Sequence, residues 1–173
     1  MPKFEIAPWM HHRCVGCGRC CTSGFDVWCP PRDRERLAAI DWGARHPELA
    51  GQTLFLRTRL GYRFALAEDG RCLFLGPDQR CYQHAELGFA AKTLTCKMYP
   101  YNLVHSGGRI YVGLLFSCPA VVDDGGPPVA GQEPLLRDLL EEMDQLFVNK
   151  DEGEETAFEG ARTIPLRELR VLE

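Results

Sequence analysis

The chain has 173 residues, of which 45% are hydrophobic, and this is enough material for one globular domain with its own core. A net charge of −4 gives no general attraction to nucleic acid or anionic lipid, so neither is expected as a partner. The sequence shows no secretory signal and no membrane span, which predicts a cytoplasmic protein. Its nine cysteines fall below the ~8–10% of a disulfide scaffold. In a reducing compartment, clustered cysteines favour metal binding or catalysis.

The first predicted feature is a cysteine block, "CVGCGRCC", that runs from Cys14 to Cys21. Cys14, Cys17 and Cys20 repeat a spacing that lets thiolates wrap one metal, and the glycines between them supply backbone freedom. Ferredoxins present three cluster ligands with the same CxxCxxC spacing. Because adjacent residues do not easily aim their sulfurs at one atom, Cys20 and Cys21 are expected to serve different metals, or different irons of one centre. The preceding histidines, at 11–12, are expected to be exposed and not to bind metal.

A helix is predicted after Pro30 and Pro31, in "PPRDRERLAAIDWGARHPE", because proline is favoured in the first turn of a helix. The alternating charges of "RDRER" indicate the solvated face of this helix. Residues 53–75 mix β-branched, aromatic and arginine residues around turn signals, which predicts a meander of short antiparallel strands. Cys72 is expected on its last strand.

Residues 81–96, "CYQHAELGFAAKTLTC", have the composition of a short helix with a cysteine at each end. The next stretch, "NLVHSGGRIYVGLLFSCP", predicts a hairpin that turns at 106–108 and places Cys118 at the end of its second strand. A change of composition at "DDGGPP" predicts a boundary between a cysteine-cluster domain, 1–122, and a linker with a C-terminal helix, 123–173.

Seven apolar residues recur at helical spacing in this last segment and predict an amphipathic helix that packs on the domain. They are Leu135, Leu136, Leu139, Leu140, Met143, Leu146 and Phe147. An amphipathic helix of this kind could instead bind a partner protein.

Eight cysteines are predicted to bind metal, which is the number needed for two four-thiolate sites or for one cluster with spare thiols. They are Cys14, Cys17, Cys20, Cys21, Cys72, Cys81, Cys96 and Cys118. Cys29 is interpreted as a buried small hydrophobic residue. His84 lies one helical turn after Cys81 and could face the same site. Lys92 is expected to be a surface lysine, with compensation of thiolate charge as the alternative.

These residues resemble the CxxCxxCC zinc- or iron-chelating family, also described as YkgJ-type cysteine cluster proteins, over about residues 14–119. The block "CVGCGRCC" is similar to the family's CxxCGxCC, "DGRCLFL" to its glycine-cysteine-apolar step, and "SCPA" to the late Cys-Pro of longer members. In the stretch 81–100, the matching residues are Cys81, His84, Gly88, Lys92, Cys96, Tyr99 and Pro100. Thr93 replaces the proline that is usual after the lysine, and the late glycine-rich segment is displaced to "DDGGPP".

The predicted fold is a small single α+β domain in which short antiparallel strands and flanking helices surround a cysteine-ligated metal centre. Two functions remain open. In the first, the cysteines hold an iron–sulfur cluster that transfers electrons or supports modification of another protein, as the looser resemblance to flagellin lysine N-methylases implies. In the second, they hold structural zinc in a scaffold or interaction module without catalysis. Either function predicts another protein as the partner. The catalytic residues, if there are any, stay unknown, and a thiol outside the metal shell but beside it, Cys21 or Cys29, is the candidate.

Overall fold

The fold was taken from a computed structural model, which describes residues 2–59, 61–144, 155–158 and 162–165. Short strands and helices alternate in it, so the predicted α+β class is confirmed. The strands are β1 Lys3–Glu5, β2 Trp28–Cys29, β3 Phe55–Thr58, β4 Gly61–Phe64, β5 Tyr101–Ser106, β6 Arg109–Leu114, β7 Glu155–Phe158 and β8 Arg162–Pro165. The helices are α1 Arg19–Thr22, α2 Pro31–Ala38, α3 Trp42–Arg45, α4 Tyr82–Leu87, α5 Leu94–Met98, α6 Pro119–Val122 and α7 Glu133–Asp144.

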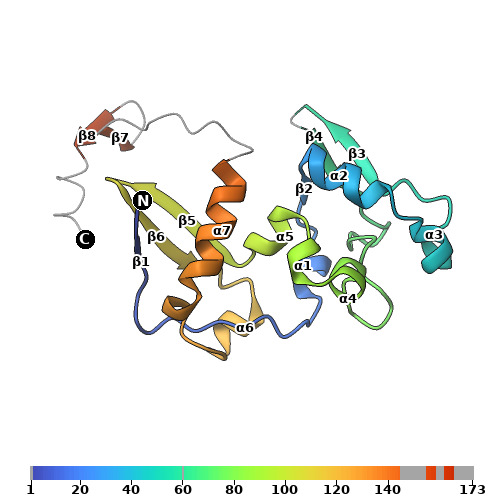
Figure 1. The fold of residues 1–173 in the computed structure, drawn as a ribbon, viewed down its shortest axis with the longest axis horizontal. Helices are drawn as coiled ribbons and strands as arrows, with labels where there is room; N and C mark the ends of the chain where they lie inside the picture. Colours follow the sequence, from blue (N-terminus) through green and yellow to red (C-terminus); the bar gives the residue numbers. More distant parts are fainter. Residues whose placement is uncertain (1, 60, 145–154, 159–161, 166–173) are drawn as a thin grey trace.

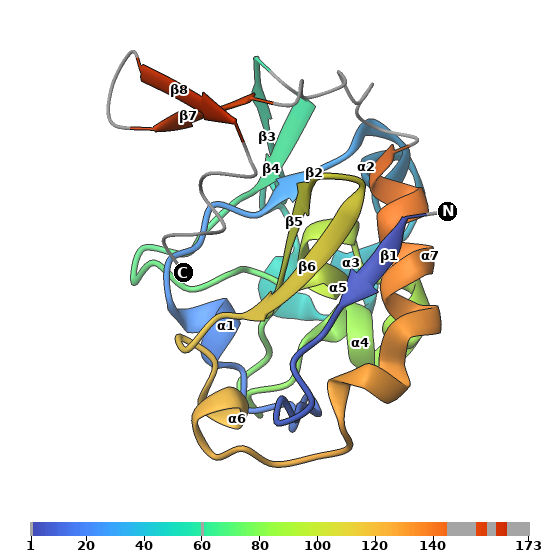
Figure 2. The same cartoon turned by 90° about the vertical axis from the view of Figure 1, so that its left-hand side faces the viewer.

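Two small sheets organise the molecule, with α5 lying between them (Figure 1). The first has the order β2-β4-β3, and together with α2, α3 and α4 it forms what we call the first lobe, residues 27–59 and 61–87. The second has the order β1-β6-β5 and, with α7 alongside it, forms the second lobe, residues 2–10 and 101–140 (Figure 2). The pairing of β1 with β6 is parallel, which the sequence did not predict.

Each lobe has its own hydrophobic core. The first core is built from the buried residues Cys29, Leu37, Trp42, Leu49, Phe64, Cys72, Phe74 and Tyr82. The second is built from Phe4, Met10, Tyr101, Ile110, Val112, Val129 and Leu136. Leu136 belongs to α7, so the predicted amphipathic helix packs on the domain, while Leu146 and Phe147 lie outside the described residues. The division of the chain at 122 stays a prediction.

Three of the predicted elements form largely as expected. The helix α2 begins at Pro31, and Leu37 on its inner face is fully buried. The strands β3 and β4 pair antiparallel, with two residues between them. The hairpin β5-β6 turns at Gly107 and Gly108, which both have the positive φ angles that tight hairpin turns require.

Three of the expectations are wrong in detail. Cys72 is not on a strand but forms an isolated bridge with Leu66. The single helix expected at 81–96 is divided into α4, a short 3₁₀ turn and α5, because Gly88 adopts φ 80° and ends α4. Cys118 lies beyond the end of β6, at the residue that precedes α6, because "LFS" forms a turn before it.

The charged run 32–36 is not uniformly solvated. Asp33 is buried, and its Oδ2 accepts hydrogen bonds from Thr93 Oγ1 at 2.7 Å and from the backbone N–H of Leu94 at 3.0 Å. Thr93 therefore starts α5 without the proline usual at this position, and Asp33 caps the helix from a distant part of the chain. In the described part of the chain, none of the helices is both long and apolar enough to cross a membrane. The cytoplasmic location stays a prediction.

Candidate metal centre

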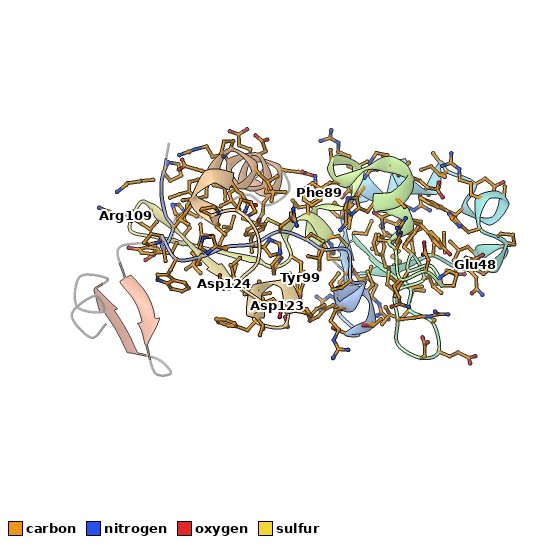
Figure 3. All side chains as sticks on the ribbon, turned by 90° about the horizontal axis from the view of Figure 1, so that it is seen from below. Glu48, Phe89, Tyr99, Arg109, Asp123 and Asp124 are labelled. Atoms are coloured by element: carbon orange, nitrogen blue, oxygen red, sulfur yellow. The ribbon has the colours of Figure 1, made fainter. Side chains whose placement is uncertain are left out.

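A cavity of about 650 Å³ lies between the two lobes and collects most of the predicted ligands. Seven of the eight cysteines line it: Cys14, Cys17, Cys20, Cys21, Cys81, Cys96 and Cys118. Phe89 and Tyr99 also line the cavity, and both lie midway between Arg109 and Glu48 at the two ends of the molecule (Figure 3). Cys72 lies behind the cavity wall, in the first core.

The cysteine block forms a loop that ends in the short helix α1. Gly16 and Gly18 both adopt φ 69°, a conformation that other residues enter only with strain. A side chain at Gly18 would come within 2.9 Å of the backbone oxygen of Gln79, so glycine lets this loop pack closely against the 76–79 turn. The loop is also tied to the first lobe, because the backbone N–H of Cys72 donates to the carbonyl of Cys21 at 2.8 Å.

Five thiols form an inner group close enough to influence each other's titration: Cys20, Cys21, Cys72, Cys81 and Cys96. The Sγ atoms of Cys20 and Cys21 are 3.8 Å apart, so adjacency in the chain does not separate them as the sequence suggested. Two thiolates on one tetrahedral zinc would also stand about 3.8 Å apart, given Zn–S bonds of about 2.3 Å. This pair could therefore share one metal ion.

Hydrogen bonds and burial divide the inner group into thiols that ionise readily and thiols that do not. Hydrogen bonding with Cys21 lowers the pKa of both Cys20 and Cys81, against the opposing effect of burial. The pKa of Cys21 is raised in return, first by its hydrogen bonds to these two thiols. Burial raises the pKa of Cys72 to about 11 and also raises the pKa of Cys96. A metal ion would replace the proton of each thiol that it binds.

Lys92 is not the surface lysine that we expected, since only 7% of it is exposed. Burial alone would lower its pKa, but the thiols of Cys96, Cys81 and Cys20 outweigh this effect and raise the pKa. The charged form of the ammonium group is therefore favoured, which agrees with the alternative interpretation that Lys92 compensates thiolate charge. The chain changes direction at Gly88 and in the 3₁₀ turn Phe89–Ala91, directly before Lys92.

The lining of the cavity is cationic although the chain is acidic. Five of its residues are Lys or Arg: Arg13, Arg19, Arg80, Lys92 and Lys97. Among the described residues that line it, none is Asp or Glu. This charge distribution favours several thiolates or another anion inside the cavity.

The remaining cavity cysteines form a looser outer group. Cys14 and Cys17 are exposed, whereas Cys118 is buried in a third, small cluster with Ala120 and Val121. His12 is also buried, contrary to the expectation of an exposed histidine, and burial lowers its pKa. Its Nε2 lies 4.0 Å from Cys118 Sγ.

Of the two remaining candidate residues, Cys29 lies outside the cavity lining and His84 belongs to it. Cys29 is fully buried in the first core and is absent from the cavity lining, which agrees with its interpretation as a small hydrophobic residue. Burial raises the pKa of Cys29 to about 12. His84 does line the cavity, although it is exposed, and burial of its ring together with the charge of Lys92 lowers its pKa.

The donor set fits a thiophilic metal chemically, because thiolates are the ligands that zinc and iron–sulfur clusters prefer. Within the described ranges, no three His, Cys, Asp or Glu side chains converge closely enough to form a complete site for one ion. Three of the five inner thiols belong to the first core or pack against it, while Cys14 and Cys17 lie on an exposed loop. A complete site for one ion therefore requires side-chain or loop adjustments around the cavity.

Three residues important to the site were missed or misjudged from the sequence: His12, Asp33 and Lys92. Asp33 and Thr93 are sixty positions apart, so no local pattern could have linked them. For His12, the only available signal was its position two residues before Cys14. For Lys92, the available signal was its position between Cys81 and Cys96 in a cysteine-rich segment.

Comparison with known proteins identifies a family for this chain. No curated protein and no solved structure matches the chain. A family model named CxxCxxCC matches residues 13–114, a range that holds seven of the eight predicted ligands and more than half of the chain. The chain therefore belongs to the CxxCxxCC family, described as "Putative zinc- or iron-chelating domain".

Proposed function

We propose that this chain holds an iron–sulfur cluster in the cavity between its lobes and serves another protein, as an electron carrier or in support of a modification reaction. The observation that carries the proposal is the gathering of seven cysteines around one cavity. A single zinc ion needs four ligands, so this surplus favours a polynuclear centre or two centres. The CxxCxxC spacing of the loop supports the same choice.

The cationic lining also supports a cluster. A cluster bound by four thiolates is anionic, and buried charge is costly unless an opposite charge lies nearby. Lys92 supplies this charge among the inner thiols, and the arginines of the lining extend it toward the surface. A bound cluster would supply one-electron chemistry. The protein's own residues would hold it, balance its charge and limit its contact with water.

Access for a partner protein is supported by the exposure of the cysteine loop. Cys14 and Cys17 are exposed, and so is Val15 between them, with 63% of its surface accessible. A centre bound by this loop would lie near the surface. Electron transfer or modification of a second protein needs such an approach.

The alternative is a structural zinc in a scaffold module without catalysis. The separation of 3.8 Å between Cys20 Sγ and Cys21 Sγ is compatible with this possibility, because it equals the edge of a zinc-thiolate tetrahedron. On this alternative, removal of zinc should unfold the chain, since structural zinc supplies ~10–16 kcal/mol against a net stability of ~5–15 kcal/mol.

The deciding experiment measures iron, zinc and acid-labile sulfide, with a visible spectrum, on untagged protein purified without oxygen. The proposal predicts brown protein with iron and sulfide in nearly equal amounts, and loss of both in Cys20→Ser and Cys96→Ser variants. Colourless protein with zinc and no sulfide would overturn it in favour of the scaffold. Protein that contains neither metal and takes up neither on reconstitution would contradict both functions.

The modification branch has its own test, because a methylase-like reaction needs a methyl donor. Equilibrium binding of radiolabelled S-adenosylmethionine to the metal-loaded protein would support this branch. If the metal-loaded protein does not bind S-adenosylmethionine, the methylation-like reaction is excluded as a function. Electron transfer then remains as the proposed function.

A further inference from the structure

A second group of side chains at the cavity is built around a histidine rather than around thiols. His12 and Cys118 both line the cavity, both are more than nine-tenths buried, and His12 Nε2 lies 4.0 Å from Cys118 Sγ. Both residues lie just outside the matched range 13–114. The family match therefore assigns nothing to this pair.

A chain of hydrogen bonds determines which nitrogen of His12 carries the proton. Gln132 Nε2 donates to the carbonyl of His12 at 2.9 Å, which orients the amide so that its Oε1 faces Tyr101. The Tyr101 hydroxyl donates to this Oε1 at 2.6 Å. Its oxygen can then only accept from His12 Nδ1, which lies 3.3 Å away. The network thus assigns the proton to Nδ1 and leaves the lone pair of Nε2 facing Cys118.

Hydrogen bonds between main-chain groups also hold the backbone of His12 in place. The N–H of His12 donates to the carbonyl of Pro127 at 3.2 Å, and the N–H of Val129 donates to the carbonyl of Met10 at 2.9 Å. At Gly126, φ is 118° and any Cβ would come within 2.7 Å of the His12 carbonyl carbon, so only glycine allows this approach. The "DDGGPP" segment therefore clamps His12 before any metal binds.

We propose that His12 is a nitrogen ligand of the metal centre through Nε2, paired with Cys118, with Tyr101 and Gln132 as positioning residues. The inference rests on the proposed metal centre and extends it to a mixed nitrogen and sulfur ligand set. An imidazole and a thiolate on one tetrahedral zinc would stand about 3.6 Å apart, so a small shift of either side chain completes the pair. A ligating histidine normally donates its other N–H to an oxygen, as Nδ1 does here.

X-ray absorption at the K-edge of the bound metal, on the full chain loaded with the iron or zinc it contains, tests this assignment directly. The wild type is expected to show imidazole scattering beside sulfur. The variant His12→Gln is expected to lose the imidazole signal and keep the sulfur signal. The matched control is His11→Gln, because His11 is adjacent in sequence, pairs with Asp124 and does not line the cavity. This control is expected to keep both signals.

A second variant separates positioning from folding. Tyr101→Phe keeps the ring but removes the acceptor for Nδ1–H, and loss of the hydrogen-bond partner of a ligating histidine typically costs about 10–100-fold in metal affinity. We expect this loss in a competition titration with a chelator, with unchanged circular dichroism. Affinity equal to the wild type would contradict the role given to Tyr101.

The possible results distinguish this inference from the proposed function. Metal-loaded wild type with sulfur ligands and no imidazole would overturn the inference and leave the metal centre intact. An imidazole signal that persists in His12→Gln would assign it to another histidine, His84 being the other that lines the cavity, and would also overturn the inference. Failure of the wild type to bind any metal would contradict the proposed function itself, and the inference with it.

Discussion

The two lobes differ in what they offer to the cavity between them. The first core includes Cys29 and Cys72, and Cys21 and Cys96 pack against it, so three of the five inner thiols are part of a packed hydrophobic unit. The buried members of the second core include no cysteine among the described residues, but they include Tyr101, whose hydroxyl lies 3.3 Å from His12 Nδ1. A metal bound by the inner thiols alone would depend mainly on the first core, whereas one that also uses His12 and Cys118 would depend on the second lobe as well.

The helix α5 connects the two sides. Cys96 lies within it and packs against the first core, while the neighbouring Lys97 donates to the Glu142 carboxylate on α7. Because a ligand that binds only the folded state stabilises that state, metal at this position should increase the stability of both lobes. Four measurements test how unequal the lobes are, and they follow in order of expected effect.

The largest effect is expected from Phe74→Ala. Phe74 is fully buried and contacts the rings of Trp42, Phe55 and Phe64, and the loss of such a ring typically costs about 3–5 kcal/mol of unfolding free energy. The variant should also retain less metal, since Cys72 lies two residues away in the same core. Urea unfolding and metal content are the measurements.

The matched variant is Leu136→Ala in the second core, where Leu136 is also fully buried. It should lose about 2–5 kcal/mol but keep its thiol-bound metal. Equal loss of metal in both variants would show that the two lobes contribute equally to metal binding.

A smaller effect is expected from Asp33→Ala. This change leaves Thr93 Oγ1 and the N–H of Leu94 without their buried acceptor, which costs about 1–3 kcal/mol. Because α5 carries Cys96, metal affinity should fall as well. The control is Asp41→Ala, which removes an exposed cap of α3 and costs about 0.5–2 kcal/mol without a change in metal affinity. A metal affinity in Asp33→Ala equal to that of the control would contradict the role of the cap.

The third measurement is the pH dependence of metal binding in Lys92→Met. The charge of Lys92 contributes to lowering the pKa of Cys20 and Cys81, so its removal should raise both values. Protons then compete with metal up to a higher pH, and the pH of half-occupancy should rise by on the order of one unit. Metal occupancy is measured against a fixed concentration of chelator. Lys92→Arg should keep the wild-type curve, and a curve unmoved by Lys92→Met would contradict the electrostatic role.

The smallest effect on metal is expected from Cys29→Ala. Cys29 packs in the first core but does not line the cavity, so metal stoichiometry should equal that of the wild type, with a stability loss of about 1 kcal/mol. The matched variant, Cys96→Ala, is expected to lose metal because its thiol does line the cavity. Metal loss in Cys29→Ala would instead place Cys29 among the ligands.

Local pattern predicted the elements whose residues act on near neighbours. Pro31 starts α2 and the two glycines turn the β5-β6 hairpin, because proline and glycine constrain the backbone at their own positions. The break in 81–96 was missed since its helical composition outweighed the single signal at Gly88. The parallel pairing of β1 with β6 joins segments about a hundred residues apart, and a three-residue strand carries no pattern that names its partner.

The sequence by itself determined the chemistry of the protein: spacing and residue type identify a thiol-rich, metal-binding chain of the CxxCxxCC family, because ligand chemistry belongs to the side chains. Tertiary structure alone decided which groups share the cavity. It buried Lys92 among the thiols, placed Asp33 under α5, and brought His12 within 4.0 Å of Cys118 across 106 positions of chain. These contacts depend on how two separate cores pack around one space, and packing of this kind has no local signature in the sequence.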